Sequence, residues 1–334
     1  MWRSAFLLAL WVLTPTILWG NEERPIQRPL IQMQPWIRFD LVMGRIIINP
    51  LQGGAWQVRQ AAHPDAIEGE SISLQVNLQP NTQITLRYEQ VDANRILTVE
   101  AHDRERISIR YEPRTDVGGP AWRFDQVPNQ PLWWDIGEEG ATQRVSANSF
   151  WHLYLAEPHT TKQHLIPILE HLRADWQLAS QSNRVAAALF TLPNEEQPLL
   201  MRSHVRGLVA RLDAASFAER QRAERALRRL GIGALCYLLE LEREPLSREQ
   251  RLRLQAVRQH LTPTSSDTPQ RIATWLHEDR LAWLALLNHA EPEKRSWART
   301  RLEQIDLVTI AFDPHAAEAD RRKQVAALKA ASLR

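Results

Sequence analysis

Hydrophobic residues occupy alternate positions along much of the first half of the chain. The clearest runs are residues 72–78, 84–88 and 107–111, and weaker runs at 41–48 and 55–58 predict earlier strands. Such alternation is typical of antiparallel strands that place one face on a core and the other in water. Turn residues separate the runs at intervals of roughly ten residues, as in a meander, a sandwich or an open barrel. We therefore predict an antiparallel β domain over residues 21–157.

The hydrophobic period changes after Pro158. Leu165, Ile168, Leu169 and Leu172 recur at the spacing of an amphipathic helix, and later segments repeat that pattern. Prolines fall between these segments, where helices end. The sequence predicts an all-α domain over residues 158–334, so that the whole chain belongs to the α+β class.

Residues 208–261 carry the strongest helix signals. Ser216 with Glu219, and Ser247 with Gln250, have the spacing of capping boxes, which begin helices. Gly231 follows a helical run, at the position where a helix favours a left-handed residue. We predict helices over 217–230, through 235–239 and from Ser247 to Leu261, joined by short turns.

The stretch from Leu212 to Val257 reads LDAASFAERQRAERALRRLGIGALCYLLELEREPLSREQRLRLQAV. It resembles the HEAT-like helical repeat of exported or multidomain bacterial proteins. The resemblance rests on Leu212-Asp213, Phe217-Ala218, Arg220, Ala223, Leu227, Leu230-Gly231, Ala234, Leu238, Ser247 and Arg251. Residues 280–305 carry a weaker echo of the pattern. The resemblance implies stacked helices that present a rigid surface to a partner, and it supplies no catalytic motif.

The N-terminus has the organisation of an export signal. Arg3 precedes an apolar stretch from Ala5 to Trp19, and Gly20 is followed by polar residues. We therefore predict a signal peptide over residues 1–20 and an exported protein, periplasmic or extracellular. Leu18 is a poor match to the usual cleavage site, so an uncleaved N-terminal tether is the alternative. The sequence predicts no other membrane segment.

Composition and charge narrow the class of protein. The chain has 334 residues, of which 44% are hydrophobic and 24% charged, and this excludes wholesale disorder and a collagen-like repeat. A net charge of +2 is no indication of a nucleic-acid partner. Cys236 is the sole cysteine, so no intrachain disulfide forms, and its apolar surroundings favour a buried thiol.

The sequence contains no pattern that indicates a catalytic site. The sequence lacks nucleophile-elbow, dinucleotide-binding and Walker motifs, and no spacing selects a Ser-His-Asp triad. Four histidines cluster at His152, His159, His164 and His171, but without the spacing of a metal site. We therefore predict no catalytic residue, no cofactor and no metal ligand.

Two further features bear on partners. Trp133 and Trp134 are adjacent, so on a strand they point to opposite faces and only one belongs to the core. The helix 217–230 carries five arginines, which predicts either a solvated face or a surface for an acidic protein or glycan.

The leading hypothesis is a non-catalytic exported scaffold with a protein partner. The alternative is an envelope hydrolase or glycan-processing enzyme whose cleft lies between the two halves, lined by Trp133, Trp134, Glu138 and the histidines of 152–171. A structural envelope component held by an uncleaved N-terminus is a third possibility.

Overall fold

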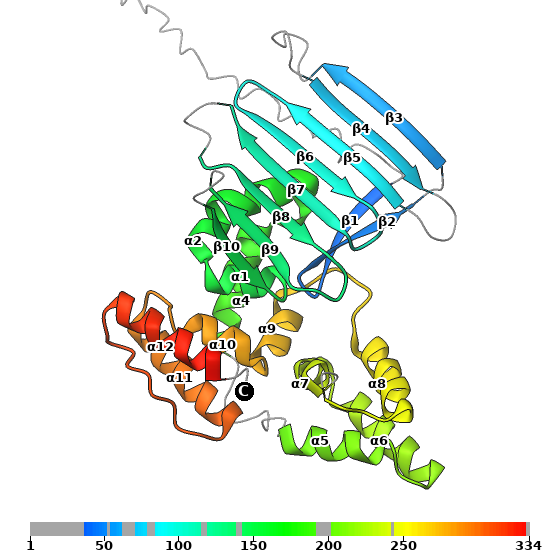
Figure 1. The fold of residues 1–334 in the computed structure, drawn as a ribbon, viewed down its shortest axis with the longest axis vertical. Coiled ribbons are helices and arrows are strands. Elements are labelled where there is room, and N and C mark those ends of the chain that lie inside the picture. Colours follow the sequence, from blue (N-terminus) through cyan, green and yellow to red (C-terminus); the bar gives the residue numbers. More distant parts are fainter. Residues whose placement is uncertain are drawn as a thin grey trace, which may run out of the picture.

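The computed structural model describes residues 37–51, 54–61, 71–78, 84–114, 119–137, 142–191, 202–241 and 244–331. An antiparallel β region comes first and a helical region follows, which confirms the predicted α+β class (Figure 1). The predicted signal segment lies outside the described residues.

Two sheets make up the β region. Strands β3 to β10 form one eight-stranded sheet in sequence order, and every neighbouring pair is antiparallel. Strands β1 and β2 pair with each other in a separate hairpin. The strands are β1 Ile37–Val42, β2 Arg45–Pro50, β3 Gly54–Ala61, β4 Ser71–Leu78, β5 Ile84–Val91, β6 Arg95–Ala101, β7 Ile107–Pro113, β8 Trp122–Gln126, β9 Leu132–Ile136 and β10 Gln143–Ala147.

The predicted alternation gives the large sheet two different faces. In β5, Ile84, Leu86 and Tyr88 are buried, whereas Thr85 and Arg87 between them are exposed. The apolar face shares its core with helices α1 (Phe150–Ala156), α3 (Ile166–Leu172) and α4 (Leu178–Thr191), and Figure 1 shows α1 behind β9 and β10. The opposite face carries polar side chains, and none of the described helices covers it (Figure 1).

The run 41–48 is not a single strand. It turns back on itself at Met43 and Gly44, which both have positive φ angles, of 54° and 67°. Such a two-residue turn matches the twist of a hairpin. Gly44 is required for a second reason, since a β-carbon there would lie 2.6 Å from Cδ1 of Trp151. That close approach comes from a distant segment, so the local pattern does not reveal it.

The helical region begins at Phe150, where Ser149 caps α1 through a hydrogen bond from the His152 amide. Helix α1 buries six consecutive residues and starts ahead of the predicted 157/158 boundary. The helices are α1 Phe150–Ala156, α2 Pro158–Thr160, α3 Ile166–Leu172, α4 Leu178–Thr191, α5 Arg202–Arg211, α6 Phe217–Arg229, α7 Leu235–Leu241, α8 Arg248–Leu261, α9 Pro269–His277, α10 Arg280–Leu286, α11 Pro292–Asp306 and α12 Glu318–Ala331, with short helical turns at Thr161–Leu165, Ala174–Trp176 and Ile232–Ala234.

The helices divide between two hydrophobic cores. Helices α1, α3, α4 and α9 to α12 share one continuous core with the sheet, and its largest side chains include Trp134, Trp151 and Trp283. Helix α4 packs against α9 although the segment 192–268 separates them in sequence. Helices α5 to α8 enclose a second core of their own, around Leu227, Leu254 and neighbouring residues. We call residues 202–261 the inserted helical unit.

Two of the predicted helix caps have different outcomes. Ser247 and Gln250 form the expected capping box at the start of α8. Ser216 makes no side-chain capping bond at the start of α6, so that part of the prediction was wrong. Gly231 follows α6 with the expected positive φ of 73°.

Candidate functional site

The open face of the large sheet carries polar side chains in register across the strands. One row crosses β4, β5, β6, β7 and β8 through directly paired residues. Its members are Gln75, Arg87, Glu100, Ser108 and Asp125. Residues directly opposite on neighbouring strands have side chains close enough to interact. The row therefore places hydrogen-bonding groups side by side on a surface that no described helix covers.

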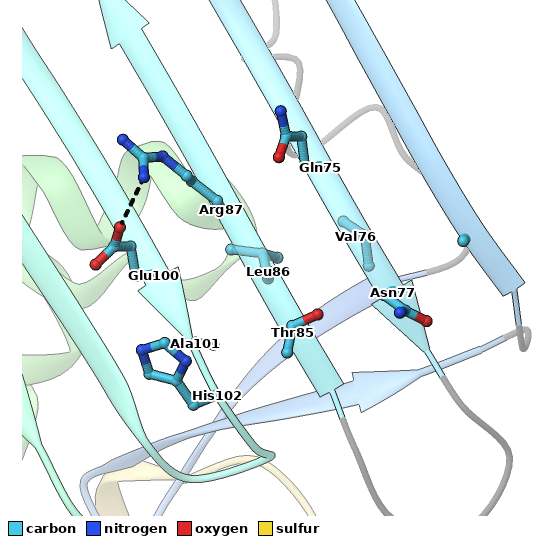
Figure 2. A pocket seen from close by; sticks show the side chains of 10 residues that line it. Gln75, Val76, Asn77, Thr85, Leu86, Arg87, Glu100, Ala101 and His102 are labelled. Atoms are coloured by element: carbon cyan, nitrogen blue, oxygen red, sulfur yellow. Dashed lines mark ion pairs between the residues drawn. The ribbon is translucent and has the colours of Figure 1, made fainter.

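A hollow of about 530 Å³ lies on this face over β4, β5 and β6. Figure 2 shows Gln75, Arg87 and Glu100 projecting from the same side of the sheet, with an ion pair joining the last two. Arg87 lies 3.5 Å from Glu100 and 3.2 Å from Glu89. Both carboxylates engage the one guanidinium, so the only arginine that lines this hollow, among the described residues, is fully compensated.

A second hollow, of about 700 Å³, lies over β7 to β10. Arg144 binds Asp135 through two hydrogen bonds of 2.6 and 2.9 Å, and this contact lowers the pKa of the Asp135 carboxyl. Trp133 lies beside the hollow, and the Arg144 guanidinium is 5.4 Å from the centre of its ring. Trp134 is fully buried beneath the sheet. The prediction that the two tryptophans face opposite sides is confirmed.

The arginines of helix α6 fall into two groups. One group is engaged in a chain of ion pairs that ties α6 to α8. The links are Arg220–Glu249 at 3.3 Å, Glu249–Arg253 at 2.6 Å, Arg253–Glu224 at 2.7 Å and Glu224–Arg228 at 2.5 Å. This network stabilises the packing of the two helices.

The second group consists of Arg222, Arg225 and Arg229, which we call the arginine stripe. All three are exposed, and their spacing of three and four residues places them along one line of the helix. Within the described part of the chain, none of them lies at ion-pair distance from a carboxylate; Arg222 and Arg225 only donate back to main-chain carbonyls of their own helix. The stripe spans roughly 10 Å at 1.5 Å per residue.

A serine, a histidine and an aspartate meet in the main core. The hydroxyl oxygen of Ser149 is 2.8 Å from Nδ1 of His152, and Nε2 of His152 is 3.1 Å from a carboxylate oxygen of Asp279. The sequence spacing concealed this contact, because Asp279 lies 127 residues beyond His152.

The geometry of this trio is structural. In a hydrolytic triad the serine meets Nε2 and the aspartate meets Nδ1, the reverse of the arrangement here. Ser149, His152 and Asp279 are 1%, 5% and 7% exposed, so the hydroxyl cannot meet a substrate without an opening of the core. Ser149 and Asp279 also cap helices α1 and α10. The trio thus holds two helix starts together.

A second buried polar group joins the inserted helical unit to the rest of the molecule. The Tyr237 hydroxyl donates to the Glu278 carboxylate at 3.1 Å, and Arg301 binds the same carboxylate at 3.1 Å. The Cys236 thiol donates to the main-chain oxygen of Glu278 at 3.3 Å. Burial raises the pKa of this thiol well above its ordinary value, as expected for an unreactive structural cysteine.

The remaining histidines of the 152–171 cluster do not converge on one site. His159 is exposed, and His164 lies near Gly119. Nε2 of His171 is 3.2 Å from the Tyr88 hydroxyl, and burial lowers the pKa of this histidine to about 4. Glu138 lies outside the described residues. Within the described chain, no group of three potential ligands is placed to hold a metal ion.

Comparison with protein-family models, with curated protein sequences and with solved structures gave no significant match. Of the helices that the structure describes, none has the length and apolar character to cross a membrane.

Proposed function

We propose that this protein is a non-catalytic, exported interaction protein that binds an acidic protein segment through the arginine stripe of helix α6. The observation that carries the proposal is the stripe itself. It consists of three exposed arginines in line, while the neighbouring arginines of the same helix are engaged with glutamates of α6 and α8.

The charge distribution supports a role for the inserted helical unit in binding. Residues 202–261 contain thirteen arginines, no lysine and seven acidic residues, whereas the rest of the chain has more acidic than basic residues. Clustered positive charge attracts an acidic partner and speeds its association. Arginine also offers a planar fork that binds carboxylates with two hydrogen bonds, which lysine does not.

The shape of the inserted unit fits the same role. Its helices enclose their own core and attach to the main body through α7 and the Glu278–Arg301 pair. We propose that these helices are a HEAT-like repeat unit, on the residues that carry the resemblance. Such units act by presenting a rigid surface.

The experiment compares wild-type protein with the triple variant R222E/R225E/R229E in binding a labelled oligoglutamate peptide. We expect at least a tenfold loss of affinity in the variant. Wild-type binding should also weaken as ionic strength rises from about 0.1 M to about 1 M, because the Debye length falls from about 10 Å to about 3 Å.

The matched control is R322E/K323E/K329E on helix α12, which changes the net charge equally at exposed positions far along the chain. It should bind the peptide as wild type does. An equal loss of peptide affinity in both triple variants would show that overall charge, and not the arginine stripe, causes the binding. An absence of wild-type binding would likewise refute the proposal.

Export is a separate part of the proposal and rests on the signal-like residues 1–20. Sequencing the N-terminus of the protein recovered from its native cells tests it. A start at or near Asn21 supports cleavage and export, whereas a protein that keeps Met1 and stays in the cytosol contradicts it.

A further inference from the structure

The second hollow on the open sheet face contains an arginine that no carboxylate of the described chain engages. Arg110, Arg123, Asp135 and Arg144 stand in one row across β7, β8, β9 and β10, each directly paired with the next. All four line the hollow of about 700 Å³. The row therefore consists of three guanidinium groups and one carboxylate, with the carboxylates of Asp125 and Glu112 beside it.

Arg110 and Arg123 are directly opposite each other on adjacent strands. Like charges in this position destabilise a sheet. Arg123 is compensated by Asp125 at 2.8 Å, and Arg144 by Asp135 at 2.6 Å. Arg110 is exposed and has no carboxylate at ion-pair distance among the described residues. An anionic group held between Arg110 and Arg123 would remove the repulsion.

The first hollow shows that this arrangement is not a general property of the sheet face. There, Arg87 is opposite Glu100 and also pairs with Glu89. That hollow has no uncompensated arginine, so the same argument gives no anion site there. Of the two hollows, only the one over β7–β10 has an arginine without a carboxylate partner among the described residues.

The other lining groups restrict the kind of anion. Glu112 and Asp135 also face the hollow, and their negative charges disfavour a small, multiply charged ion such as phosphate. A ligand with an acid group for the arginines and hydroxyl groups that donate to these carboxylates would satisfy both. Thr142 in the lining and the half-buried Trp133 beside it add a hydroxyl and an aromatic surface.

We propose that the β7–β10 hollow binds an acidic saccharide, with the carboxylate of a sugar acid held between Arg110 and Arg123 and its hydroxyl groups donating to Asp135 and Glu112. A hollow of this volume is in the range of sites that hold small organic ligands. The site uses none of the residues of the arginine stripe, so it stands independently of the proposed function.

Isothermal titration of the full chain with a galacturonic acid trisaccharide tests the proposal, beside a neutral galactose trisaccharide and inorganic phosphate. We expect binding of the acidic sugar only. Arg110→Gln should weaken that binding at least tenfold. The thermal midpoint of this variant should equal or exceed that of wild type, because the substitution removes a like-charge pair.

Two control variants complete the test. Arg87→Gln changes an arginine on the same face outside the hollow and should bind the acidic sugar as wild type does, as should R222E/R225E/R229E. Equal binding of the neutral sugar, phosphate binding as tight as that of the uronate, no uronate binding, or equal loss in Arg87→Gln would each overturn the proposal. Failure in this assay leaves the oligoglutamate result unaffected, so the two proposals are tested separately.

Discussion

Single buried carboxylates connect segments that are far apart in the sequence. The Asp267 side chain accepts hydrogen bonds of 2.7 Å from the amides of Met43 and Gly44 and from Nε1 of Trp151. Burial raises the pKa of this carboxyl, while the three donors oppose that effect. Residues 262–268, which have a linker-like composition, thereby fasten the β1–β2 turn to helix α1.

Among the residues that cap helices, we expect Asp279 to contribute most to the free energy of unfolding. Burial would raise the pKa of its carboxyl, but His152 and the amides of Leu281 and Ala282 hold it below its ordinary value. Asp279→Ala removes a cap and leaves a buried histidine nitrogen without its partner. We expect a loss of about 3 kcal/mol in urea unfolding.

Ser216→Ala is the matched control, because this N-cap is exposed and makes no capping bond. It should change stability by less than about 0.5 kcal/mol. Similar costs for the two substitutions would contradict the assigned role of Asp279.

His171 predicts a pH dependence of stability. Burial, with a smaller effect of Arg95, lowers its pKa in the folded protein from 6.5 to about 4. The unfolded chain therefore binds the proton first, so stability is complete above pH 6.5 and falls as the pH drops toward 4. Because His171 is partly solvent-accessible, we expect a contribution of about 2 kcal/mol.

The variant His171→Gln isolates this effect, since glutamine does not titrate and retains a polar group for Tyr88. Denaturant unfolding at pH values across that window should show about 2 kcal/mol less acid destabilisation in the variant. Parallel curves for variant and wild type would show that another group is responsible.

At the scale of elements, glycine is present at different positions for different structural reasons. Gly44 and Gly231 both have positive φ angles. A β-carbon at Gly44 would clash with Trp151 and Ser149, whereas one at Gly231 meets nothing within 4 Å. Gly207 lies inside α5 with open space around it.

These surroundings predict an order of stabilities for alanine variants. Gly231→Ala should cost about 2 kcal/mol for the backbone alone, because φ 73° with ψ −168° is a conformation that essentially only glycine adopts. Gly44→Ala should cost about 3 kcal/mol or more, because steric overlap adds to the backbone strain. Gly207→Ala should stabilise by about 0.5–1 kcal/mol, as helix propensity is restored. Thermal unfolding measures all three, and equal effects at Gly44 and Gly231 would disprove the contact with α1.

At the scale of the whole molecule, the chain leaves the main core after α4, builds the inserted helical unit, and returns at α9. The two clusters of buried residues have no buried member in common. The contact between them is made by apolar Leu235 and Ile232, which pack against the main core, and by the hydrogen bonds of Tyr237 and Cys236. Separate cores joined by a small contact tend to open as separate cooperative units.

Hydrogen exchange of Leu254→Ala tests this organisation. Leu254 is fully buried in the second core, and its truncation should cost about 3 kcal/mol. Amides of α5 to α8 should then exchange about a hundred times faster, with little change in β4 to β8. Leu169→Ala, in the main core, should affect the sheet instead. A uniform acceleration in either variant would indicate a single cooperative unit.

The sequence alone determined the local features of this protein. Alternation of apolar and polar residues specified the sheet and showed that only one of Trp133 and Trp134 belongs to the core, because side chains on a strand point to opposite faces. The structure decided that the buried one is Trp134. Helical spacing located most of the helices, and it also identified the arginine-rich helix. These features depend on neighbours a few residues apart, so the chain itself carries them.

Only the tertiary structure decided which charged side chains have an ion-pair partner and which do not. The free arginines of α6 are known only once Glu249 and Arg253 of α8 are in place, and the conflict at Arg110 appears only when β7 and β8 pair in register. The contacts of His152 with Asp279 and of Asp267 with Met43 span 127 and 224 residues. Local sequence patterns do not encode such pairings, because they depend on how distant elements pack together.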